Sequence, residues 1–507
     1  HISVPEADVV GVGFAGCPVI IIGHNRHLGW GLTNLQADAV DFYVETIDEA
    51  DPSRYFHRGE WKRMERIQEE IPVRGEAPHV LDIELTVHGP LITREAKTIS
   101  MAWTGLVPTR EIVALWQMTR AKNLAEFLAG VREITVPGLN VAYADVEGNI
   151  ALACSGKYPL RTRGRGRIPM DGASGHNDWR GMIPTEQMPL AVNPEEGYLA
   201  SANGRPTPIG YPHYLGWMWD PSYRTRRIHD LLSTASGITI EKMKEIQTDC
   251  YDKAAERFLP ILLAEVHDVS IEDSFARAAL EALSQWDYVA DINSVAPALW
   301  LQWFDLYRKA VWDDEWAHWG IEPIGGSWGF TGDNKREPVL EVLEYITREH
   351  PLSPWFDDKT TAQVETRKDC TLKSFSPALE TLRTEFGEDM SRYAWKNINV
   401  LHIDSLTGVE EHTRRGFPVP GTSFTLNPGG DVGSVGGGAS WRMIVDFAGP
   451  PASLGVYPGG QSETPTSTHY DDLIPIWAKG DYIPLHMVSN PSELPTEARR
   501  ISLLLRP

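Results

Sequence analysis

The stretch from Pro18 to Glu45 is the part of the sequence that most constrains the fold. It begins with an uninterrupted apolar run, Val19–Ile22, which is followed by a polar turn, Gly23–Asn25, and by a second predicted strand, Trp30–Thr33. The apolar run is too short to cross a membrane and is typical of a strand that is buried on both faces. We therefore expect a rigid pair of strands here, and side chains of functional sites usually lie on such supports.

The net charge of the chain limits which molecules it is expected to bind. The 507-residue chain carries 47 basic and 69 acidic residues, a net charge of −22. Such a chain repels nucleic acid and anionic membrane surfaces on average, so neither is an expected partner. No apolar run is long enough for a membrane span. The basic exception is Arg161–Arg167 (RTRGRGR), which is either a solvated loop or a charged lip that guides anionic substrates.

The hydrophobic pattern divides the chain into three segments. Residues 1–237 carry dense strand signals and one clear helix, for which Asn123 is the expected N-cap. Residues 238–392 show helical spacing of apolar residues and form the expected helical excursion. Residues 393–507 return to strands and long loops rich in glycine and proline. We expect ordered loops rather than disorder, and we find no internal repeat.

A series of short motifs covers nearly the whole chain. In order they are Gly23-His24-Asn25, Trp30-Gly31-Leu32-Thr33-Asn34, Asp38-Ala39-Val40-Asp41, His88-Gly89-Pro90-Leu91, Tyr143-Ala144-Asp145, Asp178-Trp179-Arg180-Gly181, Asn203-Gly204-Arg205-Pro206, Tyr223-Arg224, Ser440-Trp441-Arg442, Pro458-Gly459-Gly460-Gln461-Ser462 and His469-Tyr470-Asp471-Asp472. In this order they resemble the penicillin acylase family of N-terminal nucleophile hydrolases, which includes cephalosporin acylases and acyl-homoserine-lactone acylases.

The resemblance implies a fold and a maturation route. The expected fold class is α/β (α+β), a four-layer αββα sandwich with a helical excursion. Family members are made as precursors, exported to the periplasm or beyond, and cut into a small α chain and a large β chain. This sequence resembles the β chain without its first few dozen residues, so His1 is interpreted as a processed or truncated start and the α chain is an expected partner.

The same resemblance implies an amidohydrolase for small-molecule N-acyl amides. In the family an N-terminal serine attacks the amide while its own amino group takes the proton, and that serine is not in this chain. Asn34 matches the position whose backbone N–H faces the oxyanion, and Asn203 matches the side-chain amide donor. Arg224 matches an arginine that orients this asparagine and the amine of the nucleophile. From the residues alone, a turn residue before glycine is the favoured interpretation of Asn203, and Arg224 can be an exposed arginine in the first turn of a helix.

Calcium is the one cofactor that the resemblance implies, and no organic cofactor is expected. The matching positions are Asp38, Asp41, the carbonyl of Val40 and a carbonyl near Gly166. Two carboxylates and a carbonyl in a short turn suit a hard cation that prefers oxygen ligands. A further acidic ligand of the family is replaced near Leu215, and another would come from the α chain. Two exposed acids on a solvated turn are the alternative.

The positions that line the acyl pocket in the family match aliphatic residues here: Ile22, Leu32, Leu115 and Leu139. An aliphatic lining favours a flexible alkyl chain over a flat phenylacetyl group, because dispersion contacts depend on shape. N-acyl-homoserine lactones or other aliphatic N-acyl amides are therefore the expected substrates, ahead of penicillins. Each of these residues is equally consistent with ordinary core.

Other interpretations use different residues. Gly325-Gly326-Ser327-Trp328-Gly329 satisfies the G-x-S-x-G motif of α/β-hydrolases, with Ser327 as nucleophile, but the flanking sequence favours neither the strand nor the helix that the motif needs. His24-x-x-His27 lacks a third ligand in register, and the four cysteines form no C-x-x-C motif. A binding protein without catalysis also stays open, since eighteen tryptophans are enough to form stacking platforms.

Overall fold

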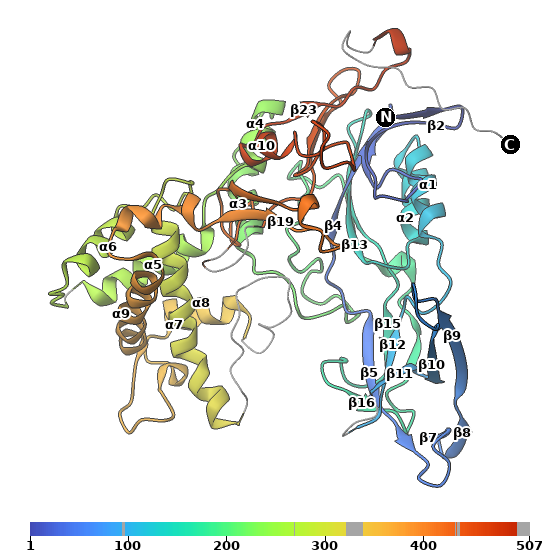
Figure 1. The fold of residues 1–507 in the computed structure, drawn as a ribbon, viewed down its shortest axis with the longest axis horizontal. Coiled ribbons are helices and arrows are strands. Elements are labelled where there is room, and N and C mark those ends of the chain that lie inside the picture. Colours follow the sequence, from blue (N-terminus) through green and yellow to red (C-terminus); the bar gives the residue numbers. More distant parts are fainter. Residues whose placement is uncertain (94–96, 268, 321–337, 431, 433–436, 494–507) are drawn as a thin grey trace. The chain divides into compact units, whose positions relative to one another are not determined.

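The structure is a computed structural model that describes residues 1–507 except 94–96, 268, 321–337, 431, 433–436 and 494–507. The chain divides into two compact units, His1–Asp220 and Pro221–Pro507 (Figure 1). The division into three segments at residues 237 and 392 stays a prediction. Gly325–Gly329, and with it Ser327, lies outside the described residues.

The first unit is built on a seven-stranded antiparallel sheet. Its order is β1-β2-β3-β4-β13-β14-β18, with bounds Ile2–Val4, Ala7–Val12, Ile22–His24, Leu28–Asn34, Leu139–Asp145, Ile150–Cys154 and Leu190–Val192. The hairpin expected between residues 140–145 and 150–154 is confirmed as β13 and β14. In the centre of the sheet, β4 pairs with β13 along its whole length, from Leu28 opposite Asp145 to Asn34 opposite Leu139.

The strand expected at Val19–Ile22 begins only at Ile22, and the turn lies two residues later than expected. The reason is Asn25, whose side-chain oxygen accepts hydrogen bonds from the backbone N–H groups of His27 (2.8 Å) and Leu28 (3.0 Å). This turn moves the reversal to residues 25–27 and leaves Gly23 inside β3. Asn25 is buried, and its amide donates to the carbonyls of Thr119 and Ala121.

Helices α1 (Glu111–Arg120) and α2 (Leu124–Glu133) cover one face of this sheet (Figure 1). Asn123 is the N-cap of α2, as expected, because its side chain accepts a hydrogen bond of 3.0 Å from the backbone N–H of Glu126. Phe127 is fully buried against Trp30 and Tyr143 of the sheet. Burying a side chain of this size stabilises the unit by roughly 1.5–3 kcal/mol.

A second sheet of the first unit has the order β16-β5-β12-β11-β10-β9. The bounds are Met170–Asp171, Val40–Val44, Ile99–Trp103, Gly89–Thr93, His79–Thr86 and Glu65–Ile71. Smaller sheets join β6 (Thr46–Ile47), β7 (Arg54–His57) and β8 (Glu60–Arg63), and join β15 (Pro159–Arg161) to β17 (Trp179–Met182); η1 is Thr185–Gln187. Because β4 leads into β5 through residues 35–39, the chain passes from the first sheet to the second directly after Asn34.

The second unit is mainly helical. Its helices are α3 (Tyr223–Leu232), α4 (Ile240–Gln247), α5 (Lys253–Val266), α6 (Ser274–Ser284), α7 (Ala296–His318), α8 (Leu340–Glu349), α9 (Arg367–Phe386) and α10 (Ile474–Ala478), with short helices η2 (Pro354–Phe356), η3 (Met390–Tyr393), η4 (Trp395–Asn397), η5 (Glu410–His412) and η6 (Pro491–Glu493). Its strands are β19 (Val400–Ile403), β20 (Arg414–Pro418), β21 (Arg442–Asp446), β22 (Ala452–Val456) and β23 (Ile483–Pro484). None of the described helices of the chain is long and apolar enough to cross a membrane.

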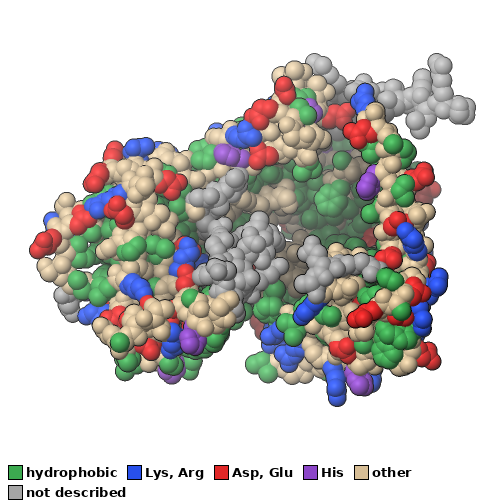
Figure 2. Space-filling view, turned by 60° about the horizontal axis from the view of Figure 1, so that its bottom comes forward, with side chains coloured by type: hydrophobic (Ala, Val, Ile, Leu, Met, Phe, Trp, Pro, Cys, Tyr) green, Lys and Arg blue, Asp and Glu red, His purple; other side chains and the backbone are tan. Residues whose placement is uncertain are grey.

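Tryptophans build the core of the second unit. Trp300, Trp303 and Trp312 on α7 are almost fully buried, and so are Trp395 and Trp477. These rings are therefore covered by protein and cannot serve as open stacking platforms for a ligand. On the face drawn in Figure 2, acidic and basic side chains are intermixed with exposed apolar ones.

The contact between β2 and β3 depends on Gly23. A Cβ atom at this position would lie 2.3 Å from the carbonyl oxygen of Val10. We expect Gly23→Ala to lower the free energy of unfolding by about 1–3 kcal/mol, because the strands must move apart. Gly31→Ala on β4 is the matched control, since a Cβ there meets no atom within 4 Å. Urea unfolding of the two variants checks this, and equal stability of both would contradict it.

Candidate active site

The two asparagines predicted as oxyanion donors lie in contact. Asn34 is the last residue of β4, and the Asn203 side-chain amide donates a hydrogen bond of 2.8 Å to the Asn34 backbone carbonyl. The amide of Asn140, on β13, donates to the same carbonyl at 3.2 Å. The fold thus brings together two residues that are 169 positions apart in the sequence.

The backbone N–H of Asn34 points away from β13. Leu35 donates its N–H to the carbonyl of Gly138 at 3.1 Å, and successive N–H groups of a strand point to opposite sides. On the opposite side of β4, β3 pairs only with Gly29 and Trp30 and ends before it reaches Asn34. The N–H of Asn34 therefore lies on the side of β4 where the ladder has stopped.

Asn203 is held in an unusual conformation by polar contacts. Its φ of 60° is in the left-handed region, which asparagine tolerates better than most residues. Its carbonyl accepts a hydrogen bond of 3.0 Å from the backbone N–H of Asp220. The carboxylate of Asp220 in turn accepts from the Gln36 side chain at 2.7 Å. Asn203 is thus a turn residue and at the same time a partner of Asn34.

Arg224 belongs to the second unit, where it lies in the first turn of α3. Its neighbours on this helix have structural partners: Arg226 pairs with Glu344 at 3.0 Å, and Arg227 pairs with Asp249 at 2.6 Å. The role of Arg224 stays a prediction.

Three of the four predicted acyl-pocket residues lie together. Leu32 on β4, Leu115 on α1 and Leu139 on β13 are half-buried and pack against the core between the seven-stranded sheet and its helices. Ile22 is half-buried at the start of β3. Leu139 is opposite Asn34 in the ladder, so an aliphatic surface lies directly beside the asparagine pair. Whether these residues contact substrate stays a prediction.

The predicted calcium residues surround a buried ion pair. Arg161 Nε donates to Asp41 Oδ2 at 2.8 Å, and its Nη2 donates to the Asp38 carbonyl at 3.0 Å. The side chains of Arg161 and Asp41 are 3% and 0% exposed. The expectation of a solvated basic loop is therefore wrong for Arg161, because the partner charge of Asp41 lies 120 residues away in the sequence and only the fold brings it close.

Two features around the Arg161–Asp41 ion pair fit an additional cation. Asp41 Oδ1 is buried and has no hydrogen-bond partner among the described residues. It lies directly against Gly166, where a Cβ would be 1.8 Å from it. Burial, reinforced by the charge of Asp41, raises the pKa of Asp38 to about 6 although Arg161 opposes this. One guanidinium therefore only partly compensates the negative charges of the two carboxylates. Val40, which lies between Asp38 and Asp41 in the sequence, offers a backbone carbonyl at the start of β5.

A group of two histidines and a carboxylate was not found by reading the sequence. His57 Nε2 and His88 Nε2 each lie 3.0 Å from one oxygen of Asp178, close enough for all three to share a metal ion. The surrounding cations argue against a metal. Lys62 Nζ lies 2.9 Å from His57 Nδ1, so His57 accepts there and carries its proton on Nε2. Arg58 lies 2.7 Å from Asp178.

Hydrogen bonds instead raise the pKa of His88, the central residue of this group. Burial alone would lower the pKa of His88, but hydrogen bonds to Glu45 (2.9 Å) and Asp178 raise it. The ring also stacks on Tyr43 with centroids 3.9 Å apart. The pKa values of Glu45 and Asp178 are lowered by the same bonds, although burial opposes this. His24 and His27 do not belong to such a group: His24 Nδ1 bonds the carbonyl of Asn25.

Comparison with known proteins gives this geometry its context. The chain matches the family model for penicillin amidase over residues 1–493. The thermostable penicillin G acylase from Alcaligenes faecalis has the same fold, with a TM-score of 0.73 at 19% identity, covering 99% of this chain and 94% of that one. The α/β sandwich class expected of N-terminal nucleophile hydrolases is thus confirmed.

The chain belongs to the penicillin amidase family. It is 27% identical to the acyl-homoserine lactone acylase QuiP of Pseudomonas aeruginosa over 95% of its own length and 62% of that protein. It is 32% identical to the penicillin G acylase of Escherichia coli over 56% of its length and 34% of that protein. The chain therefore spans about three-fifths of the length of the acyl-homoserine lactone acylase that it matches.

The charge of His88 predicts a pH dependence of stability. Because the pKa of His88 is higher in the folded than in the unfolded state, its stabilising effect is complete below about pH 6.5 and is lost as the pH rises through the folded pKa. The difference in free energy of unfolding between wild type and His88→Gln should therefore shrink above that pH. Urea unfolding from pH 5 to 9 measures this, with the exposed His79→Gln as control. A constant difference would show that folding does not raise the pKa of His88.

Proposed function

We propose that the protein carrying this chain is an N-acyl amide hydrolase in which the backbone N–H of Asn34 and the side-chain amide of Asn203 stabilise the oxyanion. The supporting observation is the contact of 2.8 Å between Asn203 and Asn34 at the open end of β4, in a member of the penicillin amidase family. Neutral N–H donors suit an oxyanion because they do not titrate and need not reorganise as charge develops on the carbonyl oxygen.

The reaction follows from these donors and from the serine that the family resemblance implies. The serine hydroxyl attacks the amide carbonyl, and the serine α-amino group takes its proton. The tetrahedral oxyanion is held by Asn34 and Asn203. The C–N bond then breaks, the amine leaves with the proton, and water hydrolyses the acyl-enzyme. The family resemblance also implies Arg224 as a positioning residue, a role that suits a guanidinium because it donates without accepting a proton.

The proposed substrates have aliphatic acyl chains. Leu139 lies opposite Asn34 and Leu32 lies two residues before it on β4, while Leu115 packs against the same core cluster and Ile22 begins the neighbouring strand. Branched aliphatic walls fit an alkyl chain through many weak dispersion contacts. Among the relatives of the chain are proteins named acyl-homoserine lactone acylase and penicillin G acylase. The aliphatic surface favours N-acyl-homoserine lactones or related aliphatic amides for this protein.

Calcium, an α chain and a location in the periplasm or outside the cell complete the proposal. Calcium would be held by Asp38, Asp41, the carbonyl of Val40 and Gly166, and it would stabilise the loop without entering the reaction. Support comes from the buried, unpartnered Asp41 Oδ1 and from the raised pKa of Asp38. The α chain, its cleavage from a common precursor and the location rest on the family resemblance.

Removal of the Asn203 amide tests the proposal. In the full-length protein, Asn203→Ala should lower kcat for a decanoyl amide by about 10²–10³, because one oxyanion donor is lost. Asn193→Ala is the matched control: Asn193 also has a positive φ of 44° and bonds Ile150 and Asn149 through its side chain. Both variants should keep the wild-type circular dichroism spectrum.

Two results would count against the proposal. Near-normal turnover of folded Asn203→Ala would remove Asn203 from the active site. Faster hydrolysis of a phenylacetyl amide than of the matching decanoyl amide would contradict the aliphatic acyl pocket while leaving the oxyanion site intact.

Calcium should stabilise the protein if the site around Asp41 is as proposed. A ligand present at about 100 times its Kd adds about 2.7 kcal/mol to the free energy of unfolding. We expect the melting temperature to rise with CaCl2 and to fall with a chelator, and we expect Asp41→Asn to abolish the difference. Asp171→Asn is the control, because among the described residues this carboxylate accepts from the nearby Ala173 and Ser174 and has no arginine or lysine partner. A melting temperature independent of calcium would leave Arg161 as the sole cation of the site.

A further inference from the structure

Four residues form a closed hydrogen-bond ring around the two predicted oxyanion donors: Asn34, Gln36, Asp220 and Asn203. The backbone N–H of Gln36 donates to the side-chain oxygen of Asn34 at 3.0 Å. The side-chain oxygen of Gln36 accepts from the backbone N–H of Asp220 at 3.1 Å, and the same N–H donates to the Asn203 carbonyl at 3.0 Å. The amide of Asn203 closes the ring on the Asn34 carbonyl at 2.8 Å. The two donors are thus connected directly and also through Gln36.

The side chain of Gln36 makes two bonds to Asp220. Its N–H group donates to the carboxylate of Asp220 at 2.7 Å, while its oxygen accepts from the backbone N–H. A primary amide carries a donor and an acceptor side by side, so both bonds form at once and fix the position of Asp220. The hydroxyls of Thr33 and Ser201, 2.8 Å apart, join the same two segments of the chain. Loss of the Gln36 side chain would therefore loosen the ring without separating the segments.

The backbone of Gln36 is strained. Its φ of 56° lies in the left-handed region, which favours glycine. A larger residue stays in such a conformation only where the surrounding contacts over-determine it, and positions of this kind cluster at active sites. For Gln36 those contacts are the bonds to Asn34 and Asp220. The strained residue also lies only two positions after Asn34, where β4 has ended.

The hydrogen-bond ring sets the direction of the Asn203 amide. An amide carries two N–H groups in one plane, so the bond of one group to the Asn34 carbonyl determines where the second group points. Asp220 holds the other end of the residue, its backbone carbonyl. Oxyanion donors act best when they are aligned before charge develops, and the required precision is about 0.5 Å. A loosened ring would therefore lower the rate of the chemical step.

We propose that Gln36 is a positioning residue for the reaction, because its side chain holds Asp220, and through Asp220 the Asn203 amide, in line with Asn34. The inference rests on the proposed function and adds the residue that aligns its two donors. Gln36 acts through Asn203 rather than on the substrate, so it affects turnover and not substrate binding. Its neutral amide does this without titrating.

Gln36→Gly in the full-length protein tests the proposal, because glycine adopts a φ of 56° without strain while the side-chain bonds are lost. We expect kcat for a decanoyl amide to fall about tenfold at unchanged KM, because only the transition state needs the lost alignment. The melting temperature should stay close to that of wild type, since relief of strain offsets the lost bonds. Gln36→Met, which keeps the length of the side chain but not its hydrogen bonds, should lower kcat to the same extent.

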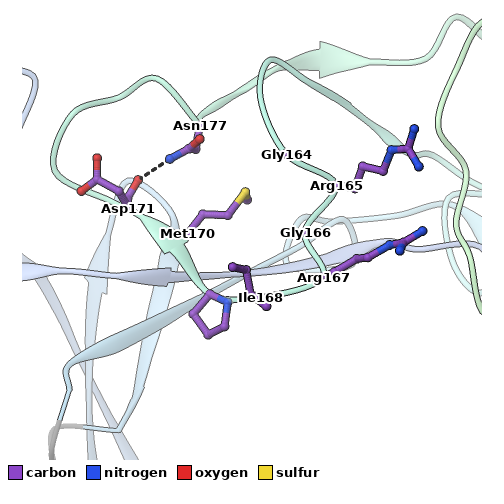
Figure 3. A pocket seen from close by; sticks show the side chains of 9 residues that line it. Gly164, Arg165, Gly166, Arg167, Ile168, Met170, Asp171 and Asn177 are labelled. Carbon is purple, nitrogen blue, oxygen red and sulfur yellow. Dashed lines mark hydrogen bonds between the residues drawn. The ribbon is translucent and has the colours of Figure 1, made fainter. Parts of the chain in front are cut away.

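A double variant and two controls separate positioning from general damage. In an Asn203→Ala background, Gln36→Gly should cause no further loss of kcat, because its effect passes through Asn203. Asn193→Gly is the matched control, since Asn193 also has a positive φ and holds its turn through its side chain. Asn177→Ala is the second control: its amide donates to the Asp171 carbonyl beside a cavity that no member of the hydrogen-bond ring lines (Figure 3). Both controls should keep the wild-type kcat.

The outcomes distinguish the positioning role from the proposed function. Wild-type kcat in Gln36→Gly and Gln36→Met, with a large loss in Asn203→Ala, would overturn the positioning role and leave the oxyanion donors in place. A rise in KM at unchanged kcat would also overturn it, because Gln36 would then contact the substrate. Independent losses that multiply in the double variant would do the same. Wild-type turnover in Asn203→Ala would instead overturn the proposed function.

Discussion

The register of β4 against β13 is the constraint on which the rest of the site depends. Side chains alternate along a strand, so a slip by one residue would turn Leu32 and the residues packed with it to the other face. The same slip would exchange the backbone groups of Asn34 and Leu35, and the N–H that now points away from β13 would bond to it. Trp30, buried against Phe127 on α2, fixes the register because its ring fits only one face of the sheet.

Buried charge is the second organising feature of the first unit. Asp41 and Arg161 are held apart from water, while Glu45 and Asp178 bond the two different ring nitrogens of His88. Isolated charges are costly to bury, so each must be matched by a partner from another part of the chain. These pairs join β5 and the residue directly after it to β15 and to the loop before β17.

Local patterns predicted the elements that depend on nearby residues. The Asn123 cap and the hairpin of β13 and β14 depend on residues within a few positions of one another, and both were predicted correctly. The series of motifs predicted that Asn34 and Asn203 lie close together, because a family resemblance carries information on contacts between distant residues. The start of β3 was missed because Asn25 makes its turn with support from Thr119 and Ala121, which no local pattern reveals. The group of His57, His88 and Asp178 was not predicted for the same reason, because its members come from three distant segments.

The carbonyl of Asn203 has a consequence for how the protein works as a whole. It is bonded to the N–H of Asp220, the last residue of the first compact unit. The turn that carries the Asn203 amide is therefore held from its carbonyl side by the residue that ends the first unit.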